Sequence, residues 1–348
     1  MVQRKKLRTC RKLVEKPDLF DALPDDLLEC VLSKLISSAP SPSDFINVLL
    51  TCKRLNRVGL RPTVLSQAGP KALAVKAKNW SDSAHRFLKR CVFAGNLEAC
   101  YTLGMIRFYC LQNRSSGTSL MAKAAMKSHA PALYSLAVIQ FNGSGGGKNE
   151  KDLRAGVALC ARAASIGHVD AVRELGHCLQ DGYGVRQNIE KGRRLLIEAN
   201  AREFFQSVSK TRTRHQSYYF QLARATDAQI PCSPLLSDFG YNVEAPEVHP
   251  VNNFLKEWFE SGVSDLGNGL RLCSYSGCGR PETRVHEYRR CSVCGKVNYC
   301  SRACQAIDWK TRHKRECVPP LAPLINDGDA DGLEGMVEIA PAEFVGGH

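Results

Sequence analysis

The chain has 348 residues, 44% of them hydrophobic, and a formal net charge of +14, values ordinary for two or three packed domains with a basic excess. No apolar run reaches the roughly 18 residues of a membrane span, and the first residues lack the apolar core of a signal peptide. We therefore expect an intracellular protein, in the nucleus or the cytoplasm, without a membrane segment.

Residues 1–17 are predicted to form a basic tail, since the first 16 residues hold seven Lys or Arg and one Glu. The run at residues 4–8 suits a nuclear-import signal, and it is also typical of a merely solvated terminus. Nucleic-acid binding is not expected, because the basic residues do not alternate with exposed aromatic residues and no recognition-helix pattern accompanies them.

Residues 18–68 predict two or three short amphipathic helices. Pro24 suits a first helical position, and Asp25 and Asp26 complement the positive helix end. A core this thin is marginal alone and predicts a stabilising partner. Two apolar stripes at helical spacing flank the proline-containing segment 39–43: Leu27, Leu28, Val31, Leu32 and Leu35, then Phe45, Val48, Leu49, Cys52, Leu55 and Val58.

Residues 20–60 resemble an F-box, whose members open with Leu-Pro and acidic residues, continue in a leucine-rich helix and later end a second leucine-rich segment in Cys-Lys-Arg. The match departs in a longer proline-containing loop and in Leu55 and Asn56, near which many members have a tryptophan. Without the resemblance, the pattern is also typical of a generic helix pair with capping aspartates. The matching residues are Leu23, Pro24, Asp25, Leu27, Leu32 and Leu35, then Leu49, Cys52, Lys53 and Arg54.

The F-box resemblance implies two partners: a Skp-family adaptor that binds these helices, and a cullin scaffold that binds the adaptor. It implies that the adaptor contacts are Leu23, Pro24, Leu27, Leu32, Leu35 and Leu49. The residues by themselves indicate only the apolar stripes.

Residues 72–205 repeat themselves and predict a short α-solenoid of about three and a half helical pairs. Ala99, Ala132 and Ala171 fall in register, with periods of 33 and then 39 residues. Glycine-containing loops at 143–147 and 181–185 supply the positive φ angles that a chain reversal requires. The second helix of each pair carries small residues that permit close approach, namely Ala124, Ala125, Ala163, Ala164 and Ala199.

The repeats resemble the SEL-type subclass of tetratricopeptide-like repeats, and the resemblance implies a concave surface that binds a partner. The alternative is a rigid spacer between two functional ends. His129, His168 and His177 have no second ligand at metal spacing, so we expect surface or hydrogen-bonded roles for them. Residues 206–268 indicate a helical and loop-like extension to which we assign no chemistry.

Residues 271–317 predict two tetrahedral structural zinc ions, because eight ligand residues occur there in four close pairs. Spacing alone permits either sequential or interleaved sites. A disulfide-rich extracellular module is disfavoured because nothing else about the chain indicates secretion, and the nine remaining cysteines are expected to be reduced and mostly buried. The pairs are Cys273 with Cys278, Cys291 with Cys294, Cys300 with Cys304, and His313 with Cys317.

The same segment resembles a MYND-type zinc finger. Ser301 is expected to cap a helix that places Gln305, Trp309, His313 and Cys317 four residues apart. The chain departs from the common pattern because four residues, not two, separate Cys273 from Cys278. The resemblance implies interleaved sites, with Cys273, Cys278, Cys300 and Cys304 holding one ion and Cys291, Cys294, His313 and Cys317 holding the other.

Because protein ligands fill all four positions of each ion, no position remains to activate water, and hydrolytic zinc catalysis is disfavoured. MYND fingers bind proteins, and the resemblance implies that Gln305 and Trp309 bind Pro-x-Leu-x-Pro peptides. A plain core role is the alternative for Trp309.

The chain carries the same peptide pattern at residues 319–323, at the start of an acidic tail, 318–348, expected to be disordered. We hypothesise that this pattern occupies the groove of a neighbouring molecule or competes with outside ligands. The alternative is a proline-rich stop signal that leads into the tail.

The expected fold is therefore mainly α, with F-box helices, a short α-solenoid and a two-zinc finger. This order of modules resembles a plant family of F-box proteins. It implies a substrate-recognition adaptor of an SCF-type ubiquitin ligase that selects its target through the repeats or the finger, and we predict no catalytic residue. Two alternatives stay open: a nuclear scaffold without ligase activity, and an enzyme, either a methyltransferase or a ligase whose finger binds the ubiquitin carrier. No methyltransferase domain is visible in the sequence.

Overall fold

The computed structural model describes residues 23–211, 246–262 and 266–319, with the backbone alone for 206–211. The basic tail, the acidic tail from residue 320 onward, and Cys10 and Cys232 lie outside these residues. The described part is mainly helical, as predicted from the sequence, with one two-stranded sheet. Among the described residues, no helix is both long and apolar enough to cross a bilayer.

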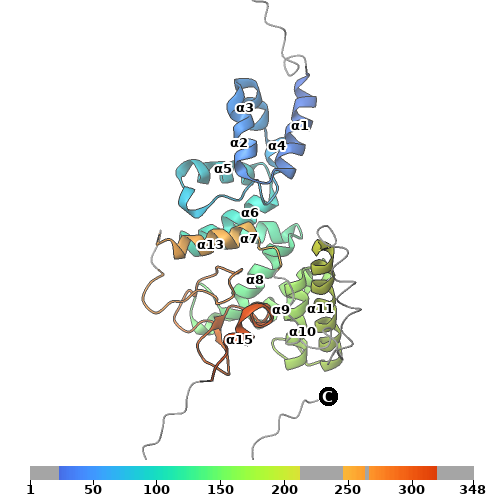
Figure 1. Ribbon diagram of the computed structural model, residues 1–348, viewed down its shortest axis with the longest axis vertical. Coiled ribbons are helices and arrows are strands. Elements are labelled where there is room, and N and C mark those ends of the chain that lie inside the picture. The colour runs from blue at the N-terminus through green and yellow to red at the C-terminus, as the bar shows by residue number, and fades with distance from the viewer. Residues whose placement is uncertain (1–22, 212–245, 263–265, 320–348) are drawn as a thin grey trace, which may run out of the picture.

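The N-terminal unit consists of four short helices and forms one end of the molecule's long axis (Figure 1). Leu28, Leu32 and Ile36 lie one turn apart on α1 and are buried against Phe45 and Leu49 of α2. The helices are α1 (Asp25–Ser38), α2 (Pro42–Thr51), α3 (Lys53–Gly59) and α4 (Pro62–Leu65).

Asp25 connects helices of the N-terminal unit and does more than cap one of them. Its carboxylate accepts hydrogen bonds from Arg54 at 3.0 Å, from Arg61 at 2.9 Å and from Arg57 at 3.3 Å. The hydrogen bond from Arg54 is the main cause that lowers the pKa of Asp25. Since α1 and α3 meet at this carboxylate, Asp25 sets how the two helices sit relative to each other.

The solenoid follows as antiparallel helix pairs in two layers (Figure 1). Asn96, His129 and His168 begin α6, α8 and α10, and each side chain accepts the backbone N–H three residues later. The inner layer, as we call it, contains α6 (Leu97–Met105), α8 (Ala130–Asn142) and α10 (Val169–Asp181), and the outer layer contains α5 (Asp82–Phe93), α7 (Arg114–Met126) and α9 (Leu153–Ser165). The remaining elements here are η1 (Ala77–Asn79), η2 (Ile106–Cys110), η3 (Lys148–Glu150) and α11 (Ile189–Thr211).

Glycines bring the layers close together. A Cβ atom on Gly117 of α7 would lie 2.7 Å from both the carbonyl oxygen of Gly104 and the amide nitrogen of Phe108, so this crossing tolerates no side chain. Asn96 anchors the solenoid to the N-terminal unit, because its amide donates to the carbonyl oxygens of Leu65, Ser66 and Ala68 at 2.9–3.1 Å.

Helix α13 (Pro250–Glu260) crosses the start of the solenoid, where Figure 1 shows it beside α6 and α7. The indole of Trp80 packs edge-on against Phe254 at 5.4 Å and against Trp258 at 6.4 Å between ring centroids. The Ala77 N–H donates to the Glu257 carboxylate at 3.1 Å. The finger then comprises β1 (Arg289–Arg290), β2 (Asn298–Tyr299), α14 (Arg302–Asp308), the π-helical turn η4 (Trp309–His313) and α15 (Lys314–Glu316), with β1 and β2 antiparallel.

Candidate metal centres and the surface that holds them

The structure brings the eight ligand residues of the finger together in two sets of four, and the sets interleave along the chain. The ligand atoms of each set lie within 4.8 Å of one another. One set is Cys273, Cys278, Cys300 and Cys304, and the other is Cys291, Cys294, His313 and Cys317. The sets interleave because β1 and β2 form a short hairpin around the second ligand pair, Cys291 and Cys294. The chain that leaves β2 then brings Cys300 to the set that contains Cys273 and Cys278.

The distances fit zinc and do not fit disulfides. A tetrahedral ion with Zn–S bonds of about 2.3 Å separates two sulfurs by about 3.8 Å, whereas a disulfide bond is only about 2.05 Å long. The Sγ atom of Cys300 lies 3.5 Å from that of Cys278 and 3.6 Å from that of Cys304. In the second set, the Sγ atoms of Cys291 and Cys317 lie 3.8 Å apart, and Cys294 Sγ lies 3.5 Å from His313 Nε2. The prediction of two structural zinc ions is confirmed.

A widened helical turn interrupts the helix that supplies ligands to both sets. Ser301 caps α14 by accepting the Cys304 N–H at 3.1 Å. In η4 the Lys314 N–H points to the Trp309 carbonyl, so Gln305, Trp309 and His313 do not follow one straight stripe. Gln305 and Trp309 are both half-buried, and the Trp309 ring lies edge-on to His313 with centroids 5.7 Å apart.

A buried arginine links the first zinc set to the repeats. Arg280 is 4% exposed; its Nη1 lies 3.5 Å from Cys278 Sγ, and its Nη2 donates to Ser135 Oγ of α8 at 2.9 Å. Four thiolates and one Zn²⁺ carry a formal charge of about −2, which would be costly to bury without a nearby cation. Arg280 therefore balances charge at the metal and attaches the finger to α8.

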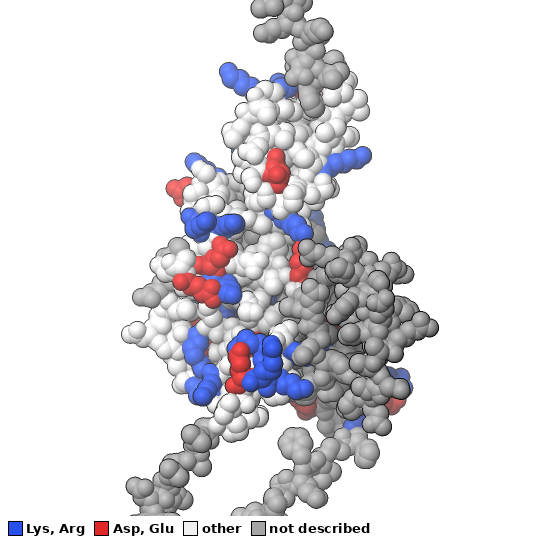
Figure 2. Space-filling model, in the orientation of Figure 1, with Lys and Arg blue, Asp and Glu red and all other residues white. Residues whose placement is uncertain are grey.

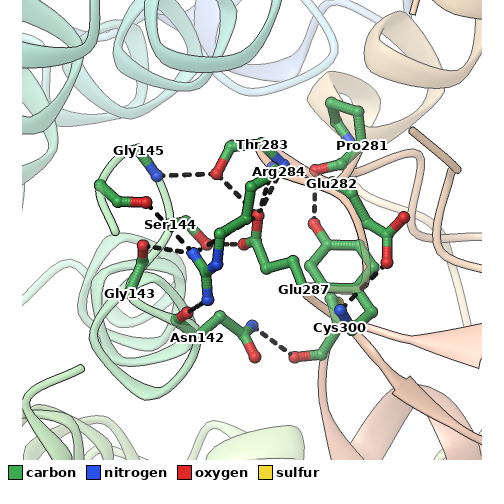
Figure 3. A network of polar contacts seen from close by, with 12 residues as sticks. Asn142, Gly143, Ser144, Gly145, Pro281, Glu282, Thr283, Arg284, Glu287 and Cys300 are labelled. Atoms are coloured by element: carbon green, nitrogen blue, oxygen red, sulfur yellow. Dashed lines mark hydrogen bonds and ion pairs between the residues drawn. The ribbon is translucent and has the colours of Figure 1, made fainter. Parts of the chain in front are cut away.

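The loop at residues 143–147, called the glycine loop below, is a second attachment point (Figure 3). Arg284 donates to carbonyl oxygens of this loop and of Asn142, including that of Gly143 at 2.7 Å. Gly145 N–H donates to Thr283 Oγ1 at 2.8 Å, and Ser144 donates to Glu287. A segment predicted only to reverse the chain thus also receives the finger.

Helix α10 caps the finger helix. The carboxylate of Glu174 accepts the backbone N–H groups of Arg302 at 3.0 Å and Ala303 at 3.3 Å, the first two residues of α14. Burial raises the pKa of Glu174, and these hydrogen bonds partly offset that effect. A fourth attachment point is also buried: Lys310 lies 2.8 Å from Asn200 and 3.1 Å from Glu203 of α11.

These contacts give the inner layer a role that the sequence did not indicate. The faces of α8 and α10 that meet the finger are covered by it, so that part of the expected concave partner surface is occupied by the chain's own finger. A cavity of about 340 Å³ remains between the inner layer, α13 and the finger, lined in part by Tyr101, Tyr134, His168 and Arg280. In the same region, Glu98 lies between His129 at 3.0 Å and His249 at 2.8 Å.

The six residues assigned to adaptor binding differ in how far the structure exposes them to solvent. Leu32 and Leu49 are only 2% and 7% exposed and lie in the core of the N-terminal unit, so their assignment to adaptor binding stays a prediction. Pro24 and Leu27 are exposed, while Leu23 and Leu35 are half-buried. Three further apolar residues, Val31, Ile46 and Leu50, are exposed and were not assigned to adaptor binding from the sequence. Val31 stands one turn from the exposed Leu27, and Ile46 and Leu50 directly follow the core residues Phe45 and Leu49.

Family models match three parts of the chain: plant tetratricopeptide repeats at residues 71–155, the Sel1 repeat at 169–203 and the MYND finger at 273–317. A protein of Arabidopsis thaliana described as an F-box protein is 64% identical over 328 residues, which cover 92% of this chain and 86% of that protein. This chain belongs to the F-box proteins.

A second F-box protein of Arabidopsis thaliana is 61% identical over 321 residues, covering 90% of this chain and 91% of its own length. Among solved structures, a Sel1 repeat protein from Oxalobacter formigenes aligns with a TM-score of 0.38 and 16% identity, over 51% of this chain and 68% of its own. The expectation of a plant F-box protein with SEL-type repeats and a MYND finger is confirmed. The modules of this F-box protein are those of a protein-interaction adaptor.

Proposed function

We propose that this F-box protein is the substrate-recognition subunit of an SCF-type ubiquitin ligase. In this proposal the N-terminal unit binds a Skp-family adaptor, the adaptor binds a cullin, and the finger and repeats hold a target protein. Membership of the F-box proteins is the observation that carries the proposal. The N-terminal unit and the finger lie toward opposite ends of the long axis, which suits a bridge between two partners (Figure 1).

An exposed apolar surface on the N-terminal unit supports adaptor binding. Leu27 and Val31 lie one turn apart on α1, each 50% exposed, and Ile46 and Leu50 lie one turn apart on α2 at 41% and 74% exposure. In the view of Figure 2, this unit presents a mostly uncharged surface. Fully burying a side chain of this size contributes roughly 1.5–3 kcal/mol, so a partner that covers these four would also stabilise a thin core.

The contribution of this chain to ubiquitination would be proximity and not chemistry. Both metal sets are completed by protein ligands, which leaves no coordination position for a reacting water. Associated subunits would supply the catalysis, while this protein raises the effective concentration of the target near the ubiquitin carrier.

Target contact is assigned to Gln305 and Trp309 of the finger. Gln305 and Trp309 are half-buried, so part of each remains accessible to a proline-leucine peptide. In our hypothesis, the chain's own pattern at residues 319–323 would compete for that surface. Only Pro319 of this pattern belongs to the described residues. Deleting residues 318–348 is then expected to raise affinity for an added Pro-x-Leu-x-Pro peptide. Unchanged affinity would remove this hypothesis.

The adaptor assignment is tested with Leu27→Asp combined with Leu50→Asp in the full-length protein. Both residues are at least half exposed, so circular dichroism is expected to stay unchanged while affinity for a recombinant Skp-family adaptor falls at least about 100-fold. Met126→Asp is the matched control, since Met126 is 73% exposed on the solenoid. Leu32→Asp is unsuitable, because it would unfold the core.

Failure of the wild-type protein to bind any Skp-family adaptor, with two zinc ions retained, would contradict the proposal. That outcome would favour the alternative, a nuclear scaffold whose finger recruits regulatory proteins without ligase activity. Localisation in the nucleus or the cytoplasm remains a proposal under either function, and the basic run at residues 4–8 lies outside the described residues.

A further inference from the structure

The outer layer of the solenoid carries a row of exposed apolar side chains. Phe93 is 86% exposed, Met126 is 73% exposed and Ile166 is 46% exposed. Each stands at the carboxyl end of an outer helix, at α5, α7 and α9 respectively. An exposed phenylalanine and an exposed methionine at the same position of consecutive repeats are an uncommon use of large apolar residues. These three residues are called the outer row.

Side-chain hydrogen bonds link each outer helix to the next. Arg107 contacts His85 of α5 at 3.3 Å and Ser116 of α7 at 2.7 Å, which joins the starts of these two helices. Arg162 of α9 donates to the Ala125 carbonyl at the end of α7 at 3.3 Å. Phe93 and Met126 stand at the same repeat position, three residues before the N-cap residues Asn96 and His129, and stacked repeats place such positions along one line. Ile166 stands one position later in its own repeat, two residues before His168.

The same layer is strongly basic. Helices α5, α7 and α9 together contain seven Lys or Arg and a single acid, Asp82. Arg90, Lys123, Lys127 and Arg162 are exposed around the outer row. Such a surface attracts an acidic segment with apolar side chains, and it repels a second copy of itself.

The outer row is also free of the finger. The finger contacts described above come from α8, α10, α11 and the glycine loop, and within the described residues none of them involves α5, α7 or α9. A ligand can therefore occupy the outer layer while the inner layer holds the finger.

We propose that the acidic segment 324–348 of this chain binds along the outer row. This segment contains six acids and no Lys or Arg, so its charge is complementary to that of the outer layer. It also contains apolar side chains that suit the row, namely Leu333, Met336, Val337, Ile339 and Phe344.

Reach does not limit this contact. The 31 residues after Cys317 span up to roughly 100 Å when extended, several times the roughly 20 Å radius of gyration of a compact chain of this size. Attachment in the same chain gives an effective concentration on the order of millimolar, so weak contacts suffice. The segment then acts as an internal competitor that covers the outer layer until an acidic region of another protein displaces it.

Carbodiimide cross-linking of the full-length protein tests the proposal, because this reagent joins lysine amines to carboxylates that are in contact. Mass spectrometry is expected to find Lys123 or Lys127 joined to acids between Asp327 and Glu343, and not Lys34 or Lys53, which are also exposed but lie on the N-terminal unit. Raising salt from 50 to 500 mM shortens the screening length from about 14 Å to about 4 Å and is expected to reduce the yield at least about fivefold.

Two variants separate a specific contact from general attraction. Phe93→Ser with Met126→Ser keeps all charges, removes the apolar row, and is expected to lower the cross-link yield about tenfold. Lys34→Glu with Lys53→Glu changes the net charge on a remote surface, and the yield is expected to stay the same. Circular dichroism checks that each variant is folded.

Several results would overturn the proposal. One is equal cross-linking of Lys34, Lys53 and Lys123, and another is a yield unaffected by loss of the apolar row. A mixture of ¹⁴N- and ¹⁵N-labelled protein decides the source of the segment: links between differently labelled chains would assign the acidic segment to a second copy and contradict binding within one chain.

Discussion

Glu98 illustrates how one residue joins elements that are distant in the sequence. Its two carboxylate oxygens lie 3.0 Å from His129 at the start of α8 and 2.8 Å from His249, which precedes α13. The Tyr101 ring packs against both imidazoles, with centroids 5.2 Å and 5.1 Å away. Burial would raise the pKa of Glu98, but hydrogen bonds from the two histidines outweigh it and lower the pKa to about 2.

Replacing Glu98 by Gln is expected to lower the free energy of unfolding by roughly 2–3 kcal/mol at pH 7. A lowered pKa in the folded state stabilises the protein above the unfolded value of 4.5, and this contribution is lost as pH falls toward about 2. The difference between wild type and variant should therefore shrink by roughly half at pH 3. Urea unfolding of both proteins over this range measures it, and a difference that stays constant with pH would contradict the assignment.

At the scale of elements, α8 is the main support of the finger. It contributes Ser135 to Arg280, Tyr134 to Ser301 at 3.1 Å, and Asn142 to the Cys300 carbonyl at 2.8 Å. The glycine loop extends these contacts beyond the end of the helix. Since Ser301 and Cys300 adjoin the first zinc set, the position of α8 and the geometry of that set depend on each other.

Replacing Arg280 by Gln is expected to weaken zinc binding at the first set by about 10- to 100-fold, the usual effect of losing a group that supports metal ligands. Unfolding should also become easier by roughly 3 kcal/mol or more, because Ser135 and the thiolates lose a buried charged partner. Chelator competition that follows release of the first and second zinc ions measures the effect. Arg290→Gln is the control, since Arg290 is exposed and lies beside the second set; equal zinc loss in both variants would refute the assignment.

At the scale of the whole molecule, the finger and the solenoid form one folded unit. Buried charges at Arg280, Glu174 and Lys310 cross the junction, and leaving any of them unpaired would cost several kcal/mol. A structural zinc supplies about 10–16 kcal/mol of apparent binding free energy, which exceeds the stability of many domains. The metal therefore stabilises the repeats as well as the finger.

Removing zinc with a chelator is expected to increase amide hydrogen exchange in α8 and α10 by at least about tenfold, in addition to exchange in the finger. The N-terminal unit should change little, because its core of Leu28, Leu32 and Phe45 lies away from the finger. Hydrogen exchange with mass spectrometry on the full-length protein measures both regions. An increase confined to residues 271–317 would show that the finger folds independently of the solenoid.

Part of this architecture is predictable because its signals are local. Short ligand spacings indicate zinc, and the period of Ala99, Ala132 and Ala171 indicates repeats. The N-cap roles of His129 and His168 were also open to prediction, because Asn96 stands at the equivalent position of the preceding unit. The exposure of Leu27 and the burial of Leu32 were not, since both belong to one apolar stripe and only the neighbouring helices decide which face is covered.

The sequence by itself determined the mainly helical class, the repeat and the two-zinc chemistry, because helix periodicity, cap residues and ligand pairs act over a few residues. Only the tertiary structure decided that the finger occupies the inner layer and that the buried charges of Arg280 in the finger and Glu174 on α10 hold it there. It also decided that, within the described residues, the finger contacts given above leave the outer layer uncovered. Those outcomes depend on contacts between residues more than a hundred positions apart, where shape and buried charge, and not spacing along the chain, select the partner.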